Sequence, residues 1–121
     1  MASLVDYGAA LRFVQTRAEA LALGFTGAHP RALFTCLRSS LPILSQPCDA
    51  FRRPGQVRAQ VRVLAQCEEL MVAVAAALHS RDAADEEKAV GEARRLCRLL
   101  GEVRATLGVY TLEEPWPKRG A

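Results

Sequence analysis

Four cysteines and two histidines are the residues of this 121-residue sequence that could bind a metal or act in nucleophilic catalysis. The cysteines follow one another at intervals of 12, 19 and 30 positions, and none belongs to a C-x-x-C pair. These intervals do not match the spacing of zinc-binding motifs. The spacing also indicates no Ser-His-Asp, Cys-His or H-E-x-x-H arrangement. We therefore expect no catalytic residue, no metal and no cofactor, and a protein that is not an enzyme. The six residues are Cys36, Cys48, Cys67, Cys97, His29 and His79.

The positions of the cysteines in the sequence favour thiols that are reduced and packed in the protein interior. Three of them fall in predicted helices, where a cysteine packs as a small hydrophobic residue. The N-terminus lacks a basic region followed by an apolar run and a cleavage site, so we expect an intracellular protein of the cytoplasm or nucleus. The longest nearly unbroken apolar run, Leu70 to Leu78, is too short to cross a bilayer, and we expect no membrane span.

An acidic group precedes the last predicted helix, but it lacks the alternating ligands and the glycine of a calcium loop. Negative charge at this place is explained by its favourable interaction with the positive end of a helix dipole. The group consists of Asp82, Asp85, Glu86 and Glu87.

Arg94, Arg95 and Arg98 cluster on the last predicted helix and are candidates for phosphate contacts. Arginine makes up fourteen of the sixteen basic residues, a skew that a GC-rich coding sequence also produces, and the formal net charge is only +3. The three arginines share an outward face with Glu102, so solvation of a charged face explains them equally. Nucleic-acid binding is therefore an alternative that the pattern does not favour.

The last thirteen residues read as an extended tail that contains the single tryptophan, Trp116, between two prolines. Aromatic side chains are frequent anchors at protein interfaces, so Tyr110, Leu112 and Trp116 are candidate partner-binding residues. The alternative is that Trp116 folds back onto the rest of the chain.

The elements that must position these residues are helices. Half of the residues are apolar and few are aromatic, which favours one core built from leucine, valine and alanine over residues 1–108, followed by the tail at 109–121. The first helix is expected from Ser3, as its N-cap, to Gly24, because apolar residues recur there at alternating steps of three and four. That stripe is Leu4, Tyr7, Leu11, Val14, Ala18, Leu21 and Phe25.

Three further helices are expected. The second begins at Pro30, and Pro42 should kink it or end it near Ser39 or Ser40. A loop over residues 45–55, anchored by Phe51, leads to a third helix that runs to about Ser80 with the stripe Val57, Val61, Leu64, Cys67, Met71, Val74 and Leu78. The fourth ends at Gly108, with the inward residues Val90, Ala93, Cys97, Leu100, Val103 and Leu107.

These patterns predict an all-α fold, an antiparallel four-helix bundle with a short or kinked second helix and an extended C-terminal tail. For function they predict a non-enzymatic helical interaction subunit or adaptor that joins one or more other proteins in a hetero-oligomer. Leu70 and Val74, in the all-apolar end of the third helix, are candidate partner contacts. The alternatives are a self-associating homodimeric bundle and an arginine-faced nucleic-acid-binding accessory domain.

Overall fold

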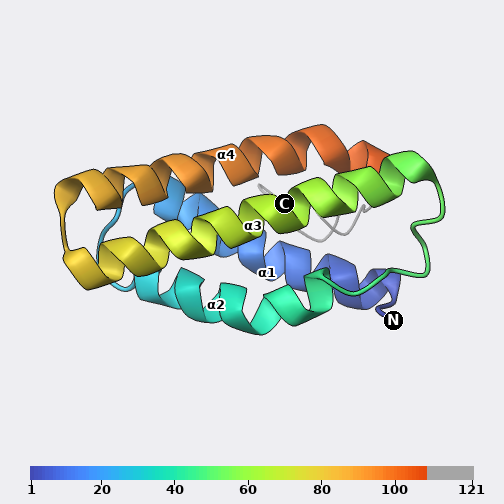
Figure 1. Ribbon diagram of the computed structural model, residues 1–121, viewed down its shortest axis with the longest axis horizontal. Helices are drawn as coiled ribbons and strands as arrows, with labels where there is room; N and C mark the ends of the chain where they lie inside the picture. Colours follow the sequence, from blue (N-terminus) through green and yellow to red (C-terminus); the bar gives the residue numbers. More distant parts are fainter. Residues whose placement is uncertain (109–121) are drawn as a thin grey trace, which may run out of the picture.

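The computed structural model describes residues 1–108, which form four α-helices in an antiparallel up-down-up-down bundle (Figure 1). Each helix packs against the two helices beside it, so that α1 and α3 both contact α2 and α4. The predicted all-α four-helix bundle is confirmed. The helices are α1 (Leu4–Ala22), α2 (His29–Leu44), α3 (Pro54–Ser80) and α4 (Ala83–Leu107).

The helix ends follow local capping chemistry. The Ser3 hydroxyl accepts a hydrogen bond from the Asp6 amide at 3.0 Å, and the Asp82 carboxylate accepts one from the Ala84 amide at 3.0 Å. Gly108 ends α4 in the left-handed conformation, with φ of 68°, which glycine adopts at no steric cost. Only Arg81 and Asp82 connect α3 to α4, so these two helices must run antiparallel.

The apolar stripe expected on α1 lies in the core. Tyr7, Leu11, Val14, Ala18 and Leu21 are all buried, while Leu4 and Phe25 at its two ends are partly buried and pack against the core. The predicted spacing on this helix is therefore confirmed.

α2 is the shortest helix, at 16 residues, but it does not end at Ser39 or Ser40. It continues through Pro42 to Leu44, which corrects the expected end point. Proline removes the hydrogen bond to the carbonyl of Arg38, four positions earlier, and its ring crowds that carbonyl. Because Pro42 and Arg38 are both exposed, that carbonyl lies on the side of the helix that faces water.

The stripe expected on α3 is wrong in its first half. Val57 and Val61 are exposed, whereas Val63, two positions beyond Val61, is completely buried. α3 packs between α2 and α4, and small residues let the helices approach closely on the side that faces them. The buried residues of α3 are Ala59, Val63, Cys67, Leu70, Ala73, Val74 and Ala77.

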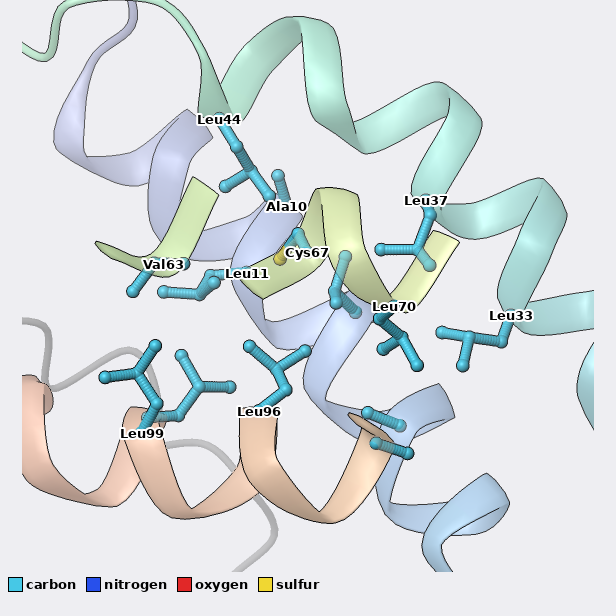
Figure 2. Close-up of a cluster of buried hydrophobic side chains, with 14 of the residues drawn as sticks. Ala10, Leu11, Leu33, Leu37, Leu44, Val63, Cys67, Leu70, Leu96 and Leu99 are labelled. Atoms are coloured by element: carbon cyan, nitrogen blue, oxygen red, sulfur yellow. The ribbon is translucent and has the colours of Figure 1, made fainter. Parts of the chain in front are cut away.

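α4 needs a smaller correction. Val90 and Cys97 are only partly buried, and Leu96 and Leu99 occupy the core instead. Figure 2 shows Leu96 and Leu99 pointing toward Leu11, Val63 and Leu70, at the centre of the bundle. The remaining expected residues, Ala93, Leu100, Val103 and Leu107, are buried.

Phe51 anchors the loop between α2 and α3, as expected. Its ring is buried and meets the ring of Tyr7 edge to face, with centroids 5.0 Å apart and planes at 88°. The same loop is tied to the N-terminus, because the Ala2 amide donates to the Pro47 carbonyl at 3.0 Å and the Asp49 amide donates to the Ala2 carbonyl at 3.2 Å. The loop thus covers the end of the bundle where α1 begins.

None of the helices in residues 1–108 is long and apolar enough to cross a membrane.

The corrected buried face of α3 predicts that the same Val→Ala substitution lowers the free energy of unfolding at one position of this helix and leaves it nearly unchanged at another. Val63→Ala should lower the free energy of unfolding by about 2 kcal/mol, because it removes two buried methyl groups and leaves a cavity. Val61→Ala, on the exposed side, should change it by less than about 0.5 kcal/mol. Urea unfolding followed by circular dichroism measures both. Equal losses for the two variants would contradict the assigned face.

Candidate interaction surfaces

The structure places the candidate residues of α3 inside the bundle. Leu70 and Val74 both have 0% of their surface exposed, so in this conformation they present nothing to a partner. The exposed large apolar residue in this part of α3 is Val72. The apolar end of α3 is therefore largely explained by the chain's own core. Tyr110, Leu112 and Trp116 lie outside the described residues.

The three candidate arginines of α4 are exposed but do not form one basic surface. Arg94 turns toward α1, where its Nε donates to the Ala22 carbonyl at 3.0 Å, at the end of that helix. Arg95 pairs with Glu92 at 3.7 Å. Arg94 and Arg95 therefore contact different groups, and each has a partner within the protein.

Arg98 lies with Arg95 along a groove of about 470 Å³ between α3 and α4, in which charges of both signs alternate. Arg62 of α3 pairs with Glu102 of α4 across this groove at 3.4 Å, and Glu69 also lines it. A phosphate that entered here would meet carboxylates beside the arginines, which weakens its attraction.

The cysteines and histidines are dispersed. His29 is the first residue of α2 and His79 lies in the last turn of α3. In the part of the chain that the structure describes, no group of three or more His, Cys, Asp or Glu side chains is close enough to hold a metal ion. The four cysteines are not joined in disulfides.

Burial makes three of the thiols poor nucleophiles. Desolvation raises the pKa of Cys67 to about 12 and that of Cys97 to about 11, and the Glu19 carboxylate adds to the effect on Cys97. Burial also raises the pKa of Cys36, against the opposing effects of a hydrogen bond to Ser40 and of the Arg17 guanidinium. A nucleophilic cysteine needs a lowered pKa, so that the thiolate is present near neutral pH. These three thiols have the opposite shift.

A large hollow between α1 and α2 was not anticipated from the sequence. It is a groove of about 620 Å³, and Phe13 stands beside it with 65% of its surface exposed. We call it the α1/α2 groove. The signal that could have found it is the position of Phe13, a large apolar residue outside the stripe of α1. The groove is lined by Phe13, Arg17, Ala28, Arg31, Ala32, Thr35, Cys36, Ser39 and Ser40.

A smaller hollow of about 230 Å³ lies where the α2–α3 loop meets the first turns of α3. Val57 and Val61, which the sequence pattern placed in the core, lie at this hollow with Leu64 and Phe51. Gln60 ties the loop to the helix here, because its Nε2 donates to the Gln46 carbonyl at 2.7 Å and to the Leu44 carbonyl at 3.2 Å. The exposed valines and the hollow form a second apolar surface, which we call the α3 valine surface.

Comparison of the chain with protein-family models, with curated proteins and with solved structures found no match.

The raised pKa values predict slow alkylation of the native thiols. At pH 8 a thiol with a pKa of about 11 has a thiolate fraction roughly 200-fold lower than an ordinary thiol with a pKa of about 8.5. A thiolate of higher pKa is more nucleophilic, which offsets part of this difference. Cys97 in the native protein should therefore react with iodoacetamide at least about tenfold more slowly than in the denatured chain, and its rate should rise with pH up to about 11. Cys67 should react more slowly still, because its pKa is higher and it is fully buried.

Pulsed alkylation followed by peptide mass spectrometry measures each cysteine separately, and the denatured chain is the control. A native Cys97 that reacts at pH 8 as fast as in the denatured chain would contradict the expected pKa.

Proposed function

We propose that this protein is a non-enzymatic interaction subunit that uses its helical surfaces to join a larger protein complex. The observation that carries the proposal is the set of large apolar side chains that the core leaves outside. Phe13 and Val61 are 65% and 60% exposed, and each lies beside a hollow. Apolar surface next to a hollow is typical of sites where a partner's side chains insert.

The chemistry of the cysteines also supports a binding role. Cys36 lines the α1/α2 groove, where a nucleophile would be accessible to a substrate, but its burial raises the pKa of the thiol. A thiol of this kind contributes to the groove as a small apolar side chain, which suits contact with a partner.

The two apolar surfaces share no residue, since one lies between α1 and α2 and the other lies where the end of α2 and the α2–α3 loop meet α3. A protein with two separate apolar surfaces can contact two partners, or one partner at two places. Self-association is the other arrangement that exposed apolar residues support, and the mass of the assembly distinguishes it from a hetero-oligomer.

The test is the composition of the assembly that the full chain forms in its native cells. A tagged chain should be recovered with a stoichiometric amount of another protein, and light scattering should give a mass above that of the 13.2 kDa chain. Phe13→Asp or Val61→Asp should reduce recovery of that protein at least tenfold, because a charge would enter an apolar contact. Both residues are exposed, so circular dichroism should show unchanged folding.

Lys88→Asp, an equally drastic change at an exposed position of α4 away from both surfaces, is the matched control and should leave recovery unchanged. A chain that is recovered alone and as a monomer would contradict the proposal. A mass of two chains with no other protein would replace it with the homodimer.

A further inference from the structure

The α1/α2 groove has positive charge with no carboxylate among its lining residues to balance it. Arg17 of α1 and Arg31 of α2 line the groove, and none of its nine lining residues is acidic. Within residues 1–108 neither arginine forms an ion pair with another side chain. This differs from the groove between α3 and α4, where arginines alternate with glutamates.

The excess of positive over negative charge extends along the whole of α2. The helix contains Arg31 and Arg38 but no aspartate or glutamate. Seven positions separate the two arginines, which is about two turns of a helix, so both lie on the same face of α2. This face of α2 therefore carries two positive charges about two turns apart.

One part of the groove lining is apolar and consists mainly of small side chains, beside the hydroxyl groups of Thr35, Ser39 and Ser40. Ala28, Ala32 and Cys36 follow one another at steps of four residues, and the ring of Phe13 stands beside them. From Ala28 to Ser40 the α2 side of the groove extends over twelve residue steps, about 18 Å at 1.5 Å per residue. That length accommodates about three turns of a second helix.

We propose that the α1/α2 groove binds an acidic amphipathic helix of a partner protein. The inference rests on the proposed function and adds the site and the chemistry of the partner. Apolar side chains of the partner, spaced by three or four residues, pack on the alanines, Cys36 and Phe13. Carboxylates beside them meet Arg17 and Arg31 at the edges of the groove, with Arg38 further along.

The apolar part of the lining favours such a helix over a nucleic acid. A phosphate backbone would be attracted by Arg17 and Arg31, but it has no apolar group to cover the alanines and the Phe13 ring. An amphipathic helix can contact the apolar part of the groove and its arginines at once, because one face of such a helix is apolar and the other is charged.

A selection from a random peptide library on the full-length protein tests the proposed chemistry. The selected peptides should be rich in Asp and Glu and should have apolar residues at positions i, i+3 or i+4, and i+7. Fluorescence anisotropy with a selected peptide should show affinity at least tenfold weaker for Arg17→Glu, Arg31→Glu and Phe13→Ala. Affinity should also fall as salt is added.

Arg58→Glu is the matched control, since it reverses the charge of an exposed arginine on α3 outside the groove, and it should change the affinity less than twofold. Peptides without an acidic preference, or peptides that bind the three groove variants as tightly as the original protein, would overturn the proposal. It would also be overturned if no peptide were selected, and a single-stranded oligonucleotide whose binding the groove variants weaken would then identify a nucleic acid as the occupant.

The chain's own residues 109–121 include Glu113, Glu114 and Trp116, which have the same acidic and aromatic chemistry. Because Trp116 is the only tryptophan, its fluorescence reports whether this segment occupies the groove. An emission spectrum that shifts in Arg17→Glu and Phe13→Ala before any peptide is added would overturn the proposal in favour of the chain's own segment. An unchanged spectrum supports a partner.

This test is separable from that of the proposed function. A co-purifying protein that is retained by Arg17→Glu and Arg31→Glu would overturn the groove assignment and leave the interaction subunit standing. Acidic peptides that bind the groove of a chain recovered without any partner would count against the proposed function alone.

Discussion

Each helix of this protein has an apolar stripe that its two neighbouring helices must cover, and the other features of the molecule follow from that requirement. Leu11, Leu37, Leu70 and Leu96 come from the four different helices and meet in one cluster (Figure 2). Burying such a side chain contributes about 1.5–3 kcal/mol, whereas a single helix of this length is marginal in water. The bundle therefore forms as a unit, and the short connection between α3 and α4 makes these helices antiparallel.

The candidate interaction surfaces are a consequence of the same packing. Once the inner faces of the helices are filled, Phe13 and Val61 have no place in the core and remain exposed. The small residues Ala28 and Ala32 then leave the space beside Phe13 that forms the α1/α2 groove. The surfaces available to a partner are thus set by the helix faces that the core does not use.

Charge is distributed unevenly over these surfaces, although the formal net charge is only +3. Arg62 of α3 pairs with Glu102 of α4, and Glu92 pairs with Arg95 within α4, so opposite charges lie close together and their fields largely cancel at a distance. α2 has cations without carboxylates of its own, and its field is not cancelled in this way. The candidate arginines of α4 therefore lie among carboxylates that offset their charge, whereas Arg17 and Arg31 line a groove without carboxylates.

The four helices, most of their ends and the buried stripe of α1 can be predicted from the sequence alone, because capping residues and heptad spacing act within one helix. The buried face of α3 depends on contacts with α2 and α4, which place Val63 inside and Val61 outside. Packing between helices likewise puts Leu70 and Val74 in the core. α2 continues past Pro42, where the carbonyl that loses its hydrogen bond lies on the side that faces water. The α1/α2 groove joins Phe13 and Arg17 to residues of another helix, and periodicity within one helix contains no information about that neighbour.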